Sequence, residues 1–175
     1  MKKLRLSTLL ALVIALVVVP TAAAHPLGNF TINHYAGLMV SREAIAIDYV
    51  LDMAEIPAFQ EIATFDANHD GQPDADEAAR YHPVQCEAIR PQLALRLNGE
   101  PVALTLVSSA IEFPPGAGGL LTLRLSCAFR APIVNVAQDA RVEFADRSYA
   151  KRLGWREIVV TGDGVSLQVE TRTYK

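Results

Sequence analysis

The stretch AIAIDYVL, Ala44 to Leu51, decides the fold class of this 175-residue chain. Its residues alternate with a period of two, which is typical of a β-strand with one buried face. We expect that face to carry Ile45, Ile47, Tyr49 and Leu51, with Ala44, Ala46 and Asp48 on the other.

The same period recurs along the chain. Leu93 to Leu97 leads into Asn98-Gly99, a favoured two-residue hairpin turn, and Val102 to Leu106 continues after it. Leu121 to Phe129 alternates again, and Glu157 to Val160 and Val165 to Val169 flank a turn at 162–164. About eight short strands separated by Gly and Pro turns predict a mainly β fold, an antiparallel β-sandwich.

One region interrupts the strands. Between Glu55 and about Ile89 the apolar spacing becomes helical, with Ile56, Phe59, Ile62 and Phe65 three residues apart. A second helix is expected through Ala78 to Tyr81, and Pro83 is expected to end or kink it. The sequence therefore predicts a helix–loop–helix insertion at about 55–90.

The loop of this insertion, DANHDGQPDADE from Asp66 to Glu77, fits the EF-hand pattern D-x-[DN]-x-[DN]-G-x5-E at every defined position. Ca²⁺ takes six to eight oxygen ligands, so oxygens must converge from alternate positions of one short loop. Gly71 lies where the chain turns sharply and a side chain would obstruct. The expected calcium ligands are Asp66, Asn68, Asp70, Gln72 through its backbone carbonyl, Asp74 and Glu77.

The alternative is an acidic, solvated loop, although acidity alone explains neither Asn68 nor Gly71. Pro73 stands at position 8, where the usual loop uses a backbone N–H to bind a partner loop, and proline has no N–H. With one such loop in the chain, we expect a solitary, structural calcium site that holds a helix pair in place.

The first 24 residues read as a signal peptide. Lys2, Lys3 and Arg5 precede the short apolar run from Leu6 to Val19, and small residues precede a cut after Ala24. An uncleaved anchor is the alternative. Without those three basic residues, 13 Lys and Arg face 19 Asp and Glu, a net charge of −6 that argues against nucleic acid as a partner. Residues 25–175 have the length of one domain.

Export changes the interpretation of the two cysteines. In an oxidising compartment a single pair of cysteines usually forms one disulfide, so Cys86 and Cys127 are expected to be linked. Free thiols are the alternative.

Several stretches together resemble a known family. They are HPLGNFTINHY from His25 to Tyr35, DMAEIPAFQE from Asp52 to Glu61, PGAGGLLTLRLSC from Pro115 to Cys127, and GWREIV from Gly154 to Val159. The combination resembles the extracytoplasmic N-terminal domain of bacterial NicO-type high-affinity nickel/cobalt transporters, over essentially all of residues 25–175.

The resemblance implies a bacterial, exported domain tethered ahead of a membrane permease, in the periplasm, outside the cell or at its surface. No apolar run of transmembrane length follows residue 24, so we expect these 175 residues to lack the permease part. We expect either a fragment of a longer, membrane-associated protein or a stand-alone secreted version.

Cleavage after Ala24 would leave His25 as the first residue. Its α-amine and imidazole could chelate Ni²⁺, Co²⁺ or Cu²⁺, with His34 as a second ligand only if the chain reversed near Gly28. The alternative is that no metal binds here, so that the terminus is simply exposed and His34 is an ordinary strand residue. His69 and His82 are expected at the surface.

The remaining candidate binding or catalytic residues give weaker evidence for a site. Asp146-Arg147 and Arg152 with Trp155 are interpreted as a surface ion pair beside a packed tryptophan, and no nucleophile-elbow or Ser/His/Asp motif appears. We expect a non-enzymatic calcium-binding domain associated with nickel/cobalt transport. The alternatives are a secreted copper-dependent oxidase or monooxygenase that uses His25, and a plain extracellular binding or adhesion module.

Overall fold

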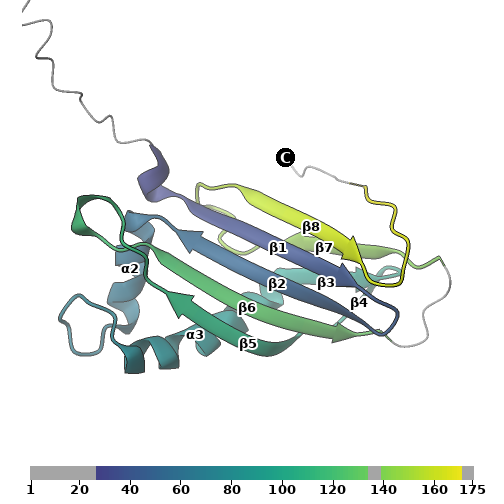
Figure 1. Cartoon of the computed structure of the whole chain (residues 1–175), viewed down its shortest axis with the longest axis horizontal. Helices are drawn as coiled ribbons and strands as arrows, with labels where there is room; N and C mark the ends of the chain where they lie inside the picture. The colour runs from purple at the N-terminus through teal and green to yellow at the C-terminus, as the bar shows by residue number, and fades with distance from the viewer. Residues whose placement is uncertain (1–26, 134–138, 171–175) are drawn as a thin grey trace, which may run out of the picture.

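A computed structural model describes residues 27–133 and 139–170, so the predicted signal peptide and His25 lie outside the described residues. Figure 1 shows the arrangement of the helices and strands. In chain order they are η1 Leu27–Phe30, β1 Ile32–Val40, β2 Ala44–Met53, α2 Glu55–Phe65, α3 Ala75–Ile89, η2 Arg90–Gln92, β3 Leu93–Leu97, β4 Glu100–Pro101, β5 Thr105–Glu112, η3 Ala117–Gly119, β6 Leu123–Pro132, β7 Val142–Asp146 and β8 Arg156–Gly162.

The strands form two sheets. The larger has the order β5-β6-β2-β1-β8, and the smaller has the order β4-β3-β7. Every pair is antiparallel except β1 and β8, which run parallel because the chain crosses from the smaller sheet back to the larger one before β8. The prediction of a mainly β chain with antiparallel sheets and two helices is confirmed, with this one parallel pair as the exception.

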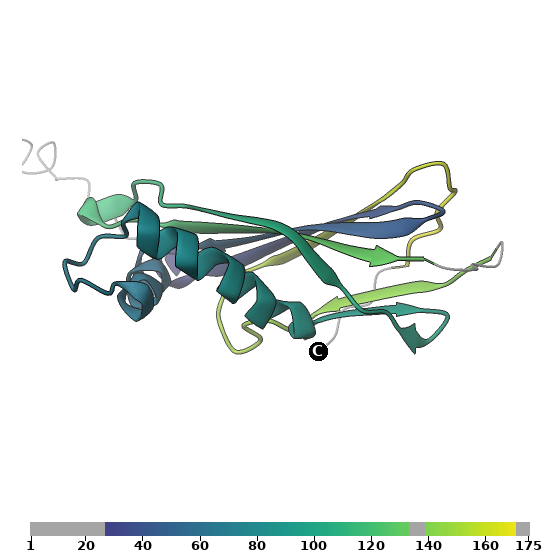
Figure 2. The same ribbon diagram turned by 90° about the horizontal axis from the view of Figure 1, so that it is seen from below.

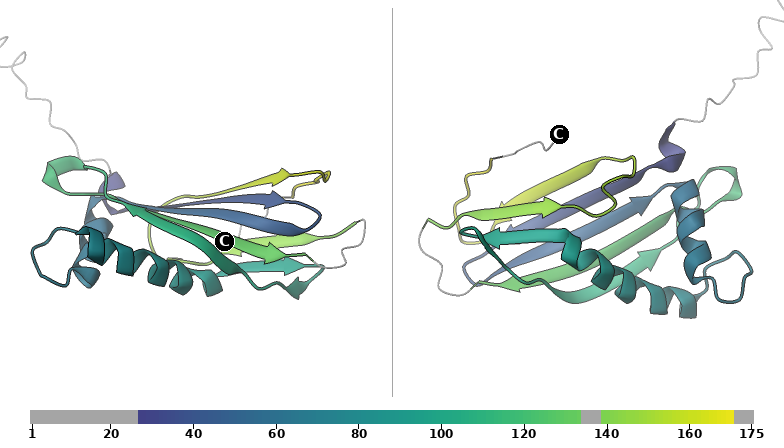
Figure 3. Two further views of the ribbon diagram at one scale, coloured as in Figure 1. Left: turned by 60° about the horizontal axis from the view of Figure 1, so that its bottom comes forward. Right: turned by 180° about the vertical axis from the view of Figure 1, so that it is seen from behind.

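One face of the larger sheet is covered by two different structures. Seen from behind, α2 and α3 lie over one end of it, and the smaller sheet lies over the other (Figure 3, right). Figure 2 shows the two sheets as separate layers, with α3 running beside them. The core lies between these layers and includes Leu93 and Leu95 of β3, Cys86 and Ile89 of α3, and the inner face of the larger sheet.

The strand that decides the fold lies at the centre of the larger sheet. The side chains of Ile45, Ile47, Tyr49 and Leu51 are completely buried, as predicted. β6 follows the same pattern, with Leu123, Leu125, Cys127 and Phe129 buried. Both strands therefore use the period-two alternation to place one set of side chains in the core.

The Asn98-Gly99 turn joins β3 to β4, and both of its residues have positive φ, as a tight hairpin requires. The predicted partner strand is short, however. It ends at Pro101, and the chain then leaves for the larger sheet as β5. One more backbone hydrogen bond follows the proline, from the Val102 N–H to the Leu95 carbonyl at 2.9 Å.

The second helix is longer than predicted. α3 continues through Pro83 to Ile89. Proline removes one helical hydrogen bond, but Cys86 and Ile89 beyond it are buried in the core, and their packing offsets that loss. Cys86 is also bonded to Cys127 of β6, so the predicted disulfide is confirmed.

The predicted hairpin near the C-terminus forms only in part. β8 and the turn at 162–164 are present, but residues 165–170 form no strand. Val165 instead packs at the edge of the core. β8 is consequently an edge strand, paired on one side with β1.

Candidate functional site

The predicted calcium loop connects the two helices directly. α2 ends at Phe65 and α3 begins at Ala75, so the described loop occupies the predicted place. Asp74 is the N-cap of α3, where its carboxylate accepts a hydrogen bond from the Glu77 backbone N–H and the Glu77 carboxylate accepts one from the Asp74 N–H. This reciprocal capping box starts the helix inside the loop.

The side-chain oxygens of the loop point toward its own backbone. The two Asp66 oxygens accept hydrogen bonds from the N–H groups of Asp70, at 3.2 Å, and Gly71, at 2.8 Å. Asn68 accepts from the N–H of Asp70, and Asp70 accepts from the N–H of Gln72. The first, third and fifth loop positions therefore fold the chain into a tight coil.

Glu77 closes this coil from the far end. One of its oxygens accepts a hydrogen bond from the Ala67 N–H, at 2.7 Å, ten residues earlier in the chain. Glu77 is 2% exposed and Asp66 is 9% exposed, whereas Asp70 and Asp74 are exposed. Two carboxylates are thus held in the interior of one short loop.

The backbone explains Gly71 differently from the sequence argument. A Cβ atom at this position would meet no atom within 4 Å, so a side chain would not obstruct anything. The φ angle of Gly71 is +77°, a conformation that residues with a side chain adopt rarely. The sharp turn, rather than crowding, requires the glycine.

Within residues 27–133 and 139–170, no three His, Cys, Asp or Glu side chains converge in an arrangement that could hold a metal ion. The loop acids satisfy their oxygens with N–H donors instead, each through a bond that leaves other lone pairs free. Calcium binding by this loop stays a prediction, and it would require the oxygens to draw together.

His34 is a core residue rather than a surface ligand. It is 2% exposed, and its Nδ1 lies 2.6 Å from the Asp146 carboxylate, 2.9 Å from the Tyr49 hydroxyl and 3.2 Å from the Ser148 hydroxyl. His82 contacts the Ser109 hydroxyl through its Nδ1. His69 is exposed, as predicted.

These contacts define a buried polar cluster of His34, Tyr49, Asp146 and Ser148, which sequence reasoning missed. It joins the two sheets, because His34 and Tyr49 belong to the larger sheet and Asp146 ends β7 of the smaller one. Arg156 of β8 adds a positive charge 3.6 Å from Asp146 and donates to the Ser148 carbonyl. No local motif signals the cluster, since its members are up to 114 residues apart.

Burial shapes the protonation of this cluster. Burial alone would raise the pKa of the Asp146 carboxyl, but hydrogen bonds from His34 and Ser148 outweigh it and hold that pKa below its ordinary value. Burial raises the pKa of Tyr49, and the Asp146 charge raises it further. Asp146 is therefore an anion in the core at neutral pH, and Tyr49 stays protonated beside it.

The cluster contains a serine, a histidine and an aspartate, but not in the order of a nucleophilic relay. Such a relay places the serine and the carboxylate on opposite nitrogens of the imidazole. Here Ser148 and Asp146 both face Nδ1, and Ser148 is completely buried.

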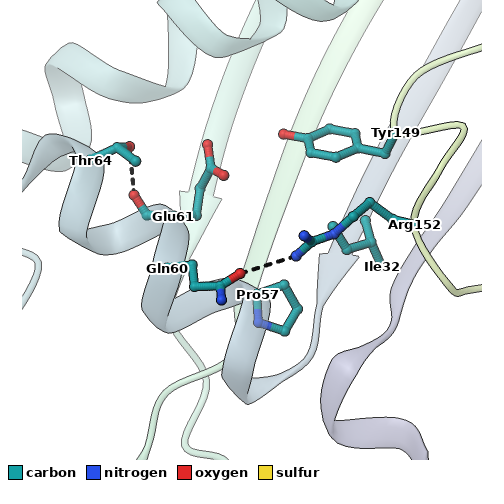
Figure 4. Close-up of a pocket in the computed structure, with 7 residues that line it drawn as sticks. All are labelled: Ile32, Pro57, Gln60, Glu61, Thr64, Tyr149 and Arg152. Atoms are coloured by element: carbon teal, nitrogen blue, oxygen red, sulfur yellow. Dashed lines mark hydrogen bonds between the residues drawn. The ribbon is translucent and has the colours of Figure 1, made fainter.

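The neighbouring turn differs from its predicted role. Asp146 is not at the surface, because its side chain is 3% exposed, and Trp155 is not packed, because it is 52% exposed. Tyr149 and Arg152 of the same turn line a cavity together with Glu61 of α2 (Figure 4). The sequence carried no signal for this cavity, because its two sides are about 90 residues apart.

Comparison with known proteins does not place this chain in a family. No family model, curated protein or solved structure matches the chain. In the described part of the chain, no helix has both the length and the apolarity needed to cross a membrane.

Proposed function

We propose that this chain is an exported, non-enzymatic domain in which the loop Asp66–Glu77 binds one structural calcium ion. One observation carries the proposal. Asp66 and Glu77, at the two ends of the loop, are both turned inward onto backbone N–H groups of the stretch 67–71, Asp66 onto Gly71 and Glu77 onto Ala67. The loop is thus already closed, with two carboxylates inside it and α2 and α3 attached to its ends.

Charge favours a cation there. Backbone N–H groups compensate the carboxylates only partly, since each carries a partial positive charge, whereas the loop carries the full negative charges of Asp66, Asp70, Asp74 and Glu77. A calcium ion would neutralise this repulsion and accept the free lone pairs, with distances of about 2.3–2.6 Å to oxygen. The ligands would be those predicted from the sequence.

The same acids have a competing role, because Asp74 and Glu77 also cap α3. The substitution Glu77→Gln separates the two roles. A glutamine can still accept the hydrogen bond of a capping box, but it cannot provide the bidentate carboxylate that closes a calcium site.

Calorimetric titration of the full chain with Ca²⁺ tests the proposal. We expect one site, lost in Asp66→Ala and weakened at least tenfold in Glu77→Gln, roughly the effect of removing a charged ligand. Asp76→Ala is the matched control, because Asp76 is an exposed acid of the same loop at a non-ligating position. No heat at millimolar Ca²⁺, or equal binding by wild type and Glu77→Gln, would contradict the proposal.

Export is supported by the Cys86–Cys127 disulfide, since such bonds persist in oxidising compartments. From the resemblance we further propose that the domain serves beside a nickel/cobalt permease. Co-purification with a co-expressed NicO-type permease, compared with an unrelated permease, tests this association.

For transition metals, we propose chelation by the processed terminus at His25, without His34. The support is that His34 is buried and its Nδ1 is occupied by Asp146. Ni²⁺ titration of a chain that starts at His25, against one extended by a single Ala, tests the chelate, and equal affinity of the two would contradict it.

A further inference from the structure

A cavity of about 260 Å³ lies between α2 and the turn that follows β7. Ile32 and Pro57 form an apolar part of its wall, and both are buried. The polar part comes from α2 on one side and from the turn on the other, as Figure 4 shows. The cavity is lined by Ile32, Pro57, Gln60, Glu61, Thr64, Tyr149 and Arg152.

Two opposite charges line this cavity without pairing with each other. The Glu61 carboxylate accepts a hydrogen bond from Tyr81 at 2.5 Å through one oxygen. The Arg152 guanidinium donates to Gln60 at 3.2 Å through one nitrogen. Among the described residues, the second oxygen of Glu61 and the remaining N–H groups of Arg152 make no hydrogen bond, and the two side chains form no ion pair.

The third polar group, Tyr149, is held in a strained position. Its φ angle is +46°, which a bulky residue adopts rarely, and such strain tends to occur where a side chain must be aimed. The preceding residue, Ser148, is fixed by the buried polar cluster, and the Tyr149 ring packs edge-on against His34. The strain therefore places the phenol at the cavity.

The Tyr149 hydroxyl can act as a hydrogen-bond donor to a ligand. It accepts a hydrogen bond from Gln85 at 2.7 Å, which leaves its own proton free. Burial, with the nearby Glu61 charge, raises the pKa of Tyr149 to about 12, so the proton is retained at neutral pH. The cavity thus offers an anion, a cation and a neutral donor.

We propose that this cavity binds a small zwitterion, an α-amino acid with a short apolar side chain. The ligand carboxylate would face Arg152 and accept a hydrogen bond from the Tyr149 hydroxyl, its ammonium group would face Glu61, and its side chain would contact Ile32 and Pro57. A simple anion would be repelled by Glu61, and a simple cation by Arg152. A zwitterion satisfies both charges at once.

The test compares three probes of one shape: L-leucine, its methyl ester, which lacks the carboxylate, and 4-methylpentanoate, which lacks the amine. The full chain, prepared with its disulfide formed, is titrated with each probe and followed by amide NMR. We expect saturable shifts around Tyr149 and α2 with L-leucine, and at least about tenfold weaker binding of the other two probes, because each lacks one charge-assisted contact.

Two variants assign the contacts. Arg152→Gln should abolish the preference for leucine over its ester, and Glu61→Gln should abolish the preference over 4-methylpentanoate. A glutamine at 61 can still accept the bond from Tyr81, so α2 and α3 keep their contact. Arg147→Gln is the matched control, an exposed arginine of the same turn outside the cavity, and should bind as wild type.

The absence of saturable binding by L-leucine would overturn the proposal. So would equal binding of the ester or of 4-methylpentanoate, or unchanged preferences in both variants. Each titration is repeated with excess Ca²⁺ and with a calcium chelator. Failure of calcium binding by the loop and failure of zwitterion binding by the cavity are then seen separately.

Discussion

The helical insertion and the buried polar cluster hold their interior carboxylates in opposite ways. In the insertion, Glu77 and Asp66 accept hydrogen bonds from backbone N–H groups within about ten residues. In the cluster, Asp146 at the end of the smaller sheet is held by His34 of the larger sheet and by its neighbour Ser148. The hydrogen bonds of the loop are local to one segment, whereas those of the cluster link the two sheets.

The two regions should therefore respond differently to the loss of a carboxylate. Removing a carboxylate from the loop should change ion binding with modest effects on folding. Removing one from the cluster should destabilise the whole domain. The disulfide connects the insertion to the larger sheet, because it links α3 to β6.

The largest effect is expected from breaking that connection. Replacing Cys86 and Cys127 together by Ser removes a link across 41 residues, and should lower the free energy of unfolding by about 4 kcal/mol on the chain-entropy model. Urea unfolding followed by circular dichroism measures it. A loss below about 1 kcal/mol would mean that core packing alone holds the insertion to the sheet.

Asp146→Asn should come next. It leaves the buried cluster without its anion, and breaking a buried charge network costs about 3 kcal/mol or more of stability. Asp48→Asn is the control, since Asp48 is exposed on the outer face of β2 and should change stability little. Equal stability of the two variants in urea would contradict a structural role for the cluster.

The stabilising effect of the Asp146 carboxylate should also appear in the dependence of stability on pH. Its pKa is lowered in the fold, so the ionised form stabilises the domain above the unfolded-chain value of about 3.9, and that contribution is lost as pH falls through the folded pKa. We expect the wild type to lose more stability than Asp146→Asn between about pH 5 and pH 2. If the free energy of unfolding fell equally with pH in both proteins, Asp146 would not be the stabilising carboxylate.

The smallest change in stability is expected from a substitution in the calcium-free loop. Asp74→Ala removes the N-cap of α3 and should cost about 1 kcal/mol in chelator, with Asp76→Ala as the control of equal charge. Thermal unfolding measures both. If Asp74→Ala lowered stability as much as Asp146→Asn, the proposed difference between the two regions would be wrong.

Sequence alone predicted the parts whose causes are local. The alternation around Ile47, the Asn98-Gly99 turn and the helix before Asp66 each depend on neighbouring residues. The disulfide needed one further fact, that the chain has only two cysteines. α3 ran past Pro83 because tertiary packing of Cys86 and Ile89 overrode the local signal.

The polar cluster and the cavity could not be predicted. His34 and Asp146 meet only because β1 and β7 belong to sheets that face each other, and Glu61 reaches Arg152's cavity only because α2 covers the end of the larger sheet. No spacing in the sequence encodes either arrangement. The departure at β8, which pairs in parallel with β1, has the same origin in the crossing between sheets.

The central claim, that an ion in the loop supports the fold, is tested most directly by measuring the free energy of unfolding against Ca²⁺ concentration. Above the dissociation constant, each tenfold increase should add about 1.4 kcal/mol in the wild type and almost nothing in Asp66→Ala, which is expected to lose the site. An unfolding midpoint that is the same in chelator and in millimolar Ca²⁺ would contradict the claim.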